Sequence, residues 1–403
     1  MPRRSTLRLR RLALAAAVAA GSAPAWGIDY VWLGGSGSWT DPSRWSPSGT
    51  PGVGDGATLG SGTATLDIDR TIDSLTMTGG NRAGTGTLTT GGLSFSSGSL
   101  TGAGATIATG TASFNGSTNQ TVNSNHVLQL NGGATWSAGN GTISAQTGGS
   151  LRVAAGTTFT DAGAASAGGT RLLGFGGGGF LNAGTYERNG LGTTNALAFT
   201  NTGTTNVNAG TLAVNSAFAN TGLVHVKAGA VLAGTSSSFA NAGMLAGDGT
   251  VRTAGSQWAL ENSGVIAPGA PDSTGALTVE GDLRLLGAGT LQVHLSSLAS
   301  FDLLSVTDDI TIGGTLNVVN LGYAPVVGDQ FVIVTFAQRL QNSVFADLTW
   351  TGFGSGVQFE LIYNPNDVTL GVLAVPEPAT WALWLAGVAG IAAMRRRRTQ
   401  DEA

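Results

Sequence analysis

The sequence predicts an all-β protein whose body is a right-handed parallel β-helix, or β-solenoid, with coils of about 20 residues. Three observations predict this class: a motif repeated at a nearly constant interval, short alternating apolar segments between turn residues, and a long stretch without proline. The composition agrees, because glycine accounts for 65 of 403 residues and charged residues for only 10%, whereas about 25% charged residues are usual. Such a chain is expected to gain its order from repetition rather than from a set of compact domains.

The repeated motif is an aromatic residue or leucine, followed two positions later by asparagine and four positions later by glycine. Its five asparagines recur about every 20 residues, and they are Asn182, Asn201, Asn220, Asn241 and Asn262. In stacked coils, Phe199, Phe218 and Phe239 would form an internal stack, and the asparagines a ladder whose amides bond to the equivalents above and below. We interpret this ladder as structural rather than ligand-binding.

The texture between the motifs supports the same class. Apolar residues alternate over three to five positions, as from Leu212 to Val214, and no proline occurs from Gly52 to Ala267. Interior strands need their backbone N–H groups, which proline lacks. Residues 83–151 have a weaker period and contain no Asp, Glu, Lys or Arg. Disorder or amyloid-like assembly is the alternative for such a stretch, but its regular β-branched and aromatic positions favour a solenoid of roughly 10 to 12 coils, on the order of 50–60 Å long.

Both ends of a solenoid need covering, because an open coil is an edge strand. Residues 28–82 are expected to hold an aromatic cap and the first coils, since Trp32, Trp39 and Trp45 recur there with prolines between them. These three tryptophans are also candidates for stacking on sugar rings, and the two roles can coexist. Residues 83–280 are expected to form the repeats. Residues 281–374 have longer alternating strands and predict a strand-rich C-terminal cap, either wider coils or a small β-sandwich.

The N-terminal segment, residues 1–27, has the features of a signal peptide. It combines a basic start, an apolar run from Leu12 to Ala20 and small residues at Ala23 and Ala25. We therefore expect the protein to be exported.

The C-terminal segment, residues 375–403, combines three features in a fixed order. Pro376, Glu377 and Pro378 come first, followed by an apolar run over 379–394 and by four arginines over 395–398. The prolines favour an extended segment, the apolar run predicts a short transmembrane helix, and the arginines would hold its end on the cytoplasmic side of a membrane.

This order closely resembles the PEP-CTERM sorting signal of Gram-negative bacteria that make extracellular polysaccharide. The resemblance covers the C-terminal segment 375–403. It implies that Pro376, Glu377 and Pro378 are recognised by an exosortase, a membrane Cys protease or transpeptidase. It also implies a protein held in the envelope before processing and then placed at the cell surface or in the extracellular matrix. The aromatic N-terminal segment resembles that of many autotransporter-like and PEP-CTERM repeat proteins. The turn from Asn262 to Gly269 resembles the end of autotransporter-associated β-strand repeats.

Several classes of function are excluded or disfavoured by composition. The chain has no cysteine and three histidines, which excludes thiolate metal sites and disulfides, and we expect no cofactor or metal. Residues 27–378 carry 10 basic and 21 acidic side chains, a net charge that disfavours nucleic acid. Asp67 and Asp69 are candidates for calcium binding or acid–base chemistry, but we interpret them as an exposed polar face. His225 and His294 are expected to face outward from alternating strands.

These observations predict a structural or adhesive surface or matrix protein, not an enzyme, that is processed through its tail and associates with extracellular polysaccharide. The alternative is a polysaccharide lyase or glycoside hydrolase on a β-helix scaffold. Carboxylates and bases that meet across adjacent coils in one groove would favour this alternative.

Overall fold

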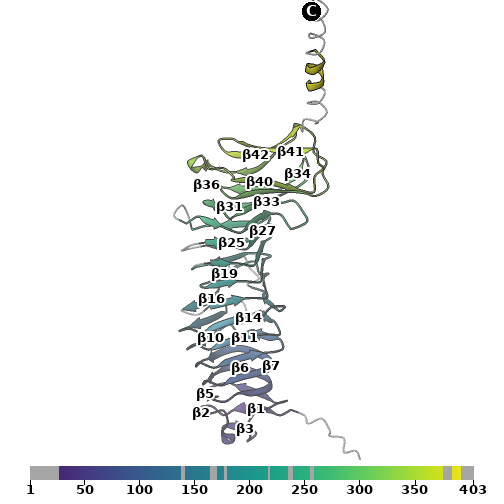
Figure 1. Ribbon diagram of the computed structural model, residues 1–403. Coiled ribbons are helices and arrows are strands. Elements are labelled where there is room, and N and C mark those ends of the chain that lie inside the picture. The colour runs from purple at the N-terminus through teal and green to yellow at the C-terminus, as the bar shows by residue number, and fades with distance from the viewer. Residues whose placement is uncertain are drawn as a thin grey trace, which may run out of the picture.

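The computed structural model describes residues 27–137, 141–163, 170–176, 179–216, 218–234, 239–254, 258–374 and 384–391. The predicted signal peptide up to residue 26 and the Pro376, Glu377, Pro378 motif lie outside these residues. The body is a rod of stacked β-coils, with the N-terminal coils at one end and the C-terminal strands at the other (Figure 1). It is a parallel β-solenoid of about 11 turns with 57% strand and 4% helix, which confirms the predicted fold class.

Each regular coil consists of three short strands, and each strand pairs in parallel with its equivalent in the next coil. In one coil these are β20 (Phe199–Asn201), β21 (Thr204–Val207) and β22 (Thr211–Val214). The next coil stacks β23 (Phe218–Asn220), β24 (Leu223–Val226) and β25 (Val231–Gly234) on them in the same order. Three parallel sheets therefore run along the rod, which we name sheets I, II and III in the order in which a coil visits them.

Sheet I carries the Phe and Asn positions of the repeat. Besides β20 and β23 it contains β8 (Ala105–Ala108), β11 (Val127–Leu130), β14 (Ser150–Val153), β17 (Gly179–Asn182), β26 (Phe239–Asn241), β29 (Leu260–Asn262), β32 (Leu283–Leu285), β36 (Asp309–Thr311) and β39 (Gln338–Arg339). The two long strands β6 (Arg70–Ala83) and β7 (Thr87–Leu100) bend through all three sheets.

Sheet II follows sheet I in each coil. Besides β21 and β24 it contains β1 (Asp29–Trp32), β4 (Gly56–Leu59), β9 (Ala112–Phe114), β12 (Ala134–Trp136), β15 (Thr158–Asp161), β18 (Thr185–Arg188), β27 (Met244–Gly247), β30 (Val265–Pro268), β33 (Thr290–Ser297), β37 (Thr315–Asn320) and β40 (Asp347–Thr351).

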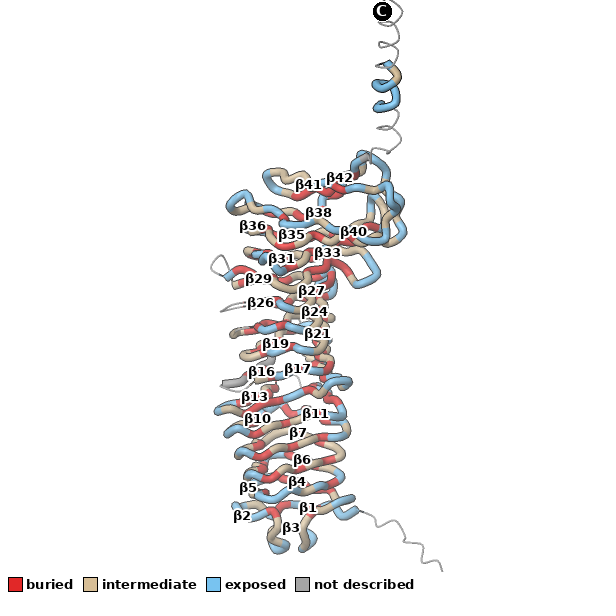
Figure 2. Tube along the Cα trace, in the orientation of Figure 1, coloured by how far each residue is buried: buried red, intermediate tan, exposed pale blue. Residues whose placement is uncertain are grey.

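Sheet III closes each coil. Besides β22 and β25 it contains β2 (Ser36–Ser38), β5 (Thr63–Thr65), β10 (Asn119–Asn123), β13 (Thr142–Gln146), β16 (Thr170–Gly176), β19 (Thr193–Ala196), β28 (Thr250–Arg252), β31 (Ala276–Glu280), β35 (Leu303–Val306) and β38 (Gln330–Thr335). The inward side chains of the three sheets form one continuous core along the rod, and the outward ones are intermediate or exposed (Figure 2).

The predicted internal stack and ladder are both present on the inward side of sheet I. The ring centroids of Phe180, Phe199, Phe218 and Phe239 follow one another at 5.1, 6.2 and 5.0 Å. At the other end of each strand, the amide nitrogen of each asparagine from Asn182 to Asn241 donates to the amide oxygen of the next, at 2.8, 2.8, 2.7 and 2.7 Å. All five asparagines are buried, so the ladder is a core element and not a ligand site.

Coil length varies more than the repeat motif indicates. Thr87 pairs with Ala105 in a short coil, Ala105 with Val127 in a longer one, and Ser150 with Gly179 in one that is longer still. The added residues enter the turns, while the strands keep their register. This variation explains why residues 83–151 have a weak period in the sequence although they form regular coils.

An aromatic cap closes the N-terminal end, as predicted. Strand β3 (Trp45–Ser46), which follows the short 3₁₀ turn η1 (Pro42–Arg44), folds back antiparallel on β1. This arrangement places Trp45 next to Trp32 and Trp39, and the indole N–H of Trp45 donates to the carbonyl oxygen of Trp39 at 2.7 Å. The indoles therefore cover the apolar interior of the first coil.

The C-terminal segment follows the first predicted possibility, wider coils, and it ends in an antiparallel pairing. Parallel stacking continues from β33 to β37 and on to β40, where Thr315 pairs with Asp347 across a wider coil. Side elements include β34 (Ser300–Phe301) and the turn η2 (Leu340–Asn342). Strands β41 (Val357–Tyr363) and β42 (Asp367–Ala374) then pair antiparallel with each other, and β42 pairs antiparallel with β38. This reversal of direction ends the parallel stack.

The predicted transmembrane helix over 379–394 is only partly described. Residues 384–391 form one short helix beyond the rod (Figure 1). Among the described residues, no helix is both long enough and apolar enough to span a bilayer. The predicted membrane span is therefore without support from the structure.

Replacing Asn201 by alanine should destabilise the rod by about 1–3 kcal/mol, because the change leaves buried amide groups of its ladder neighbours without a partner. Asn208 is the matched control, since its amide donates to Asn189 and Glu187 of the preceding coil on the outward side of the rod, where water can take its place. Its replacement by alanine should cost less than about 0.5 kcal/mol. Denaturant unfolding of both variants checks this prediction, and equal midpoints would contradict a core role for the ladder.

Candidate functional site

The three cap tryptophans are not available to a sugar ring. Trp32, Trp39 and Trp45 are 3%, 0% and 1% exposed. The ring centroid of Trp45 lies 5.0 Å from that of Trp32 and 4.8 Å from that of Trp39, with the planes steeply inclined to one another. Their rings pack on one another, so the prediction of carbohydrate contact through these residues is wrong. Spacing along the chain could not show this, because the same spacing serves a buried cluster and an exposed platform.

Asp67 and Asp69 lie in the turn between β5 and β6 rather than on a strand. A carboxylate oxygen of Asp67 accepts from the backbone N–H of Thr85 at 3.2 Å, and one of Asp69 accepts from that of Thr87 at 2.8 Å. Each carboxylate thus braces the equivalent turn of the next coil. Within the described part of the chain, no group of three His, Cys, Asp or Glu side chains is placed to hold a metal ion.

His126 and Arg82 form a polar cluster in the interior of the early coils. The two ring nitrogens of His126 lie 3.0 Å from the hydroxyl of Thr106 and 3.1 Å from the carbonyl oxygen of Gly102, and the guanidinium of Arg82 lies 3.3 Å from the ring. Burial is the larger cause and the positive charge of Arg82 the smaller cause that lower the pKa of His126 to about 3. Arg82 donates to the carbonyl oxygens of Gly86 and Ala105, and burial lowers its pKa to about 10. The cluster is therefore a neutral histidine beside a charged arginine.

The prediction that His294 faces outward is wrong. His294 is 1% exposed, and its Nδ1 lies 2.7 Å from the carboxylate of Asp302. The hairpin of β33 with β34 brings this aspartate back over the strand. Asp302 also accepts from the backbone N–H of Gly275 at 2.8 Å, and burial raises the pKa of this carboxyl. The pair is enclosed within the wider coils, away from any surface where a substrate would meet it. His225, in contrast, is half-buried on the outward side of β24.

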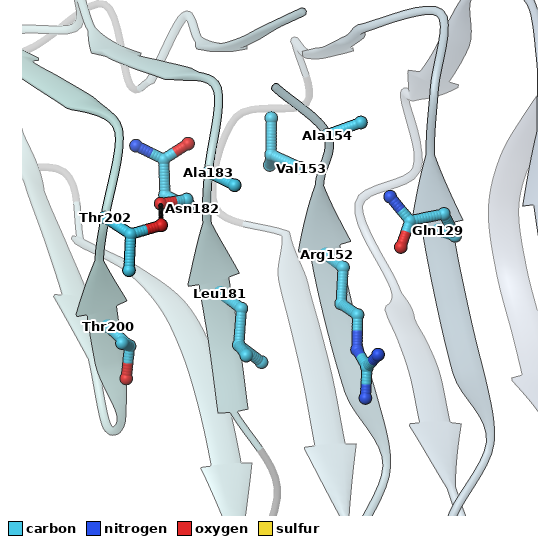
Figure 3. A pocket seen from close by; sticks show the side chains of 9 residues that line it. All are labelled: Gln129, Arg152, Val153, Ala154, Leu181, Asn182, Ala183, Thr200 and Thr202. Atoms are coloured by element: carbon cyan, nitrogen blue, oxygen red, sulfur yellow. Dashed lines mark hydrogen bonds between the residues drawn. The ribbon is translucent and has the colours of Figure 1, made fainter.

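A half-open pocket of about 200 Å³, which the sequence pattern does not predict, lies on the outward side of sheet I. Its side chains Gln129, Arg152, Leu181 and Thr200 are consecutive in register on β11, β14, β17 and β20 (Figure 3). Val153, Ala154, Asn182, Ala183 and Thr202 complete its lining. Arg152 is exposed, and no hydrogen bond or ion pair joins it to another residue that the structure describes.

One signal in the sequence could have pointed to this pocket. Over residues 83–160, Arg152 is the single charged side chain. The neighbours of Arg152 in the pocket could not be predicted from the sequence. Arg152 and Leu181 lie side by side across the longest coil of this region, which departs from the regular period of about 20 residues.

A second hollow, at the C-terminal end, is lined by Gln338, Arg339, Asn342, Tyr363, Asn364 and Pro365. Here the arginine is engaged. Arg339 donates to the carbonyl oxygen of Ser343 at 2.8 Å, and its guanidinium carbon lies 4.8 Å from the ring centroid of Tyr363. This hollow therefore offers a ligand no free cation.

Comparison with known proteins bears on the C-terminal segment. Residues 374–398 match the PEP-CTERM protein-sorting motif. The motif includes Pro376, Glu377 and Pro378, and it implies an exported protein that an exosortase sorts at the envelope of a Gram-negative bacterium. No curated protein matches the chain. The match therefore concerns where the protein goes, and the activity of the solenoid has to be argued from its surfaces.

The buried histidine makes stability depend on pH. The folded protein holds His126 neutral down to about pH 3, whereas the unfolded chain takes up a proton below its ordinary pKa of 6.5. The unfolded state binds more protons in this window, so stability falls as the pH drops from 6.5 towards 3, by up to about 1.4 kcal/mol per pH unit.

Glutamine does not take up a proton in this pH range. Replacing His126 by glutamine should therefore flatten the dependence of stability on pH between pH 6.5 and pH 4. Denaturant midpoints of both proteins over this range measure the slope, and midpoints at pH 7.5 give the pH-independent cost of the substitution. Parallel curves for the two proteins would show that His126 is not the titrating group.

Proposed function

We propose that the protein is a non-catalytic surface or matrix component that associates with extracellular polysaccharide after exosortase processing. The observation that carries this proposal is the combination of a PEP-CTERM sorting motif with a solenoid rod, because the motif follows directly on the last strand of the rod, β42. Processing at the motif would release or attach the rod at that end. The three long sheets would then face the surroundings of the cell.

The composition of the outward rows supports contact with a polyhydroxyl polymer. On sheet II, six residues consecutive in register are hydroxyl side chains on the outward side: Thr58, Thr76, Ser94, Ser113, Thr135 and Thr160. On sheet III, a second such row consists of Ser36, Thr63, Asn81, Ser99 and Thr121. Hydroxyl and amide groups both donate and accept hydrogen bonds, as sugar hydroxyls do. Such uncharged rows suit a hydrated polysaccharide without demanding one sequence of sugars.

The arrangement of carboxylates favours a structural role over the polysaccharide lyase or glycoside hydrolase alternative. Glycoside hydrolysis uses two carboxylates that flank the scissile bond. Asp67 and Asp69 are engaged in turns, Asp302 is enclosed with His294, and no carboxylate is among the residues that line the pocket on sheet I. These engagements support the absence of catalysis as part of the proposal.

Replacing Pro376, Glu377 and Pro378 together by alanine should abolish processing in the native host. The variant should keep its C-terminal peptide and stay with the envelope, whereas the native protein should lose that peptide and appear at the surface or in the matrix. Cell fractionation with mass spectrometry of the mature C-terminus measures both properties. Thr399→Ala with Gln400→Ala is the matched control, because these residues follow the matched segment.

Two results would contradict the proposal at different points. Normal processing of the triple variant would mean that the motif is not the sorting element. A native protein that is processed but washes away from cells and matrix without retaining polysaccharide would mean that sorting is right and the association with polysaccharide is wrong.

A further inference from the structure

We propose that the pocket around Arg152 binds a carboxylate-bearing sugar unit of an acidic polysaccharide chain. This inference rests on the proposed function and deepens it, because it names the site and the chemistry of the sugar. The neutral hydroxyl rows do not distinguish one polysaccharide from another. The pocket on sheet I holds one positive side chain, Arg152, and can therefore distinguish an acidic polysaccharide from a neutral one.

The charge of Arg152 is uncompensated, unlike that of three other surface arginines. Arg252 pairs with Glu280 at 2.5 Å, Arg284 pairs with Glu261 at 3.2 Å, and Arg44 lies 3.8 Å from Asp41. Arg152 has no such partner among the described residues.

The outward row of sheet I on which Arg152 lies is otherwise neutral from β7 to β26. In register along the outward side of sheet I, the neighbours on one side are Gln129, Ile107 and Thr89, and those on the other side are Leu181, Thr200, Ala219 and Ala240. None of them carries a charge. An anion that lies along this row between Thr89 and Ala240 therefore meets one positive side chain and no carboxylate of the row.

A guanidinium selects a carboxylate through geometry as well as charge. Its N–H groups form a planar fork that matches the two oxygens of a carboxylate. One guanidinium balances one carboxylate, whereas a phosphate group with close to two negative charges is better matched by several cations. The single free arginine therefore points to a uronate rather than to a phosphorylated sugar.

The rest of the pocket suits a sugar ring attached to that carboxylate. Leu181, 38% exposed, provides an apolar surface next to Arg152, on which the C–H groups of a ring can pack. The amide of Gln129 and the hydroxyl of Thr200 stand on the strands to either side and can bond to sugar hydroxyls (Figure 3). Neighbouring strands are about 4.8 Å apart, so the row from Gln129 to Thr200 spans about 14 Å.

The size of the pocket favours a chain over a small ligand. At about 200 Å³ it is smaller than the roughly 300–1,000 Å³ of pockets that engulf a small molecule, and it is open to solvent. It can seat one ring while the flanking sugars continue along the neutral face. The occupant is therefore a segment of a polymer that lies on sheet I.

Binding of the purified full-length chain to three probes tests the inference: polygalacturonate, uncharged dextran and galacturonate monomer. Titration calorimetry should show binding to polygalacturonate that is at least tenfold tighter than binding to either of the other two. Arg152→Gln should weaken it about tenfold or more, and Arg152→Lys should retain an intermediate affinity, because lysine keeps the charge and loses the fork. Raised salt should weaken the binding of polygalacturonate to the native protein more than its binding to Arg152→Gln.

Arg284→Gln is the matched control, since Arg284 is an exposed arginine on the same sheet that is already paired with Glu261. Its affinity for polygalacturonate should equal that of the native protein. Unfolding midpoints of all variants should agree, which separates a lost contact from a lost fold.

Three results would overturn the inference. Equal affinity of the native protein and Arg152→Gln for polygalacturonate would exclude Arg152 as the binding residue. Galacturonate monomer binding as tightly as the polymer would make the site one for small carboxylates. A protein that retains the exopolymer of the host but does not bind polygalacturonate would contradict the acidic-sugar site and not the proposed function. A protein that neither retains the exopolymer nor binds polygalacturonate would contradict the proposed function as well.

Discussion

The parallel register between successive coils is the constraint on which the rest of this structure depends. Backbone hydrogen bonds alone would allow a coil to slide, because every residue of a strand offers the same groups. The inward side of sheet I removes this freedom. An asparagine amide is both donor and acceptor, so each of Asn201, Asn220 and Asn241 bonds through its oxygen to one coil and through its nitrogen to the other only when both coils place an asparagine at the same position. The phenylalanine stack at the other end of the same strands imposes the same register by packing.

Because inward side chains fix the register of the strands, the number of residues in each coil can vary in the turns. Turns accept extra residues without disturbing the strands, and short and long coils occur in one stack. The outward side chains then follow the strands and not the sequence spacing. This is how Arg152 and Leu181 become neighbours, and how hydroxyl side chains from successive coils form one row on sheet II. The surfaces that we connect with polysaccharide are thus a by-product of a register that the core determines.

The two ends show how a repeating stack is terminated. At the N-terminal end, β3 reverses direction and its Trp45 completes a buried aromatic cluster, which explains the absence of an exposed indole platform among the described residues of the cap. At the C-terminal end, β42 runs antiparallel to β38 and stops further parallel addition. Closed ends keep the rod from recruiting other edge strands. The sorting motif begins at the end of this last strand. It concerns where the protein is sent, and the stacking of the coils does not depend on it.

The sequence by itself determined the repeat, the inward Phe and Asn positions, the need for two caps and the sorting motif, because each of these depends on residue type at a fixed local spacing. Only the tertiary structure decided which outward residues lie together and which are covered. Strand alternation predicts that His294 points to solvent, but a hairpin brings Asp302 over it and buries the pair. The same limit applies to Trp32, Trp39 and Trp45, whose exposure depends on a strand that folds back, and to the pocket at Arg152, whose members meet across coils of unequal length. Local spacing specifies the direction of a side chain from its own strand, and the folded chain decides what that side chain meets there.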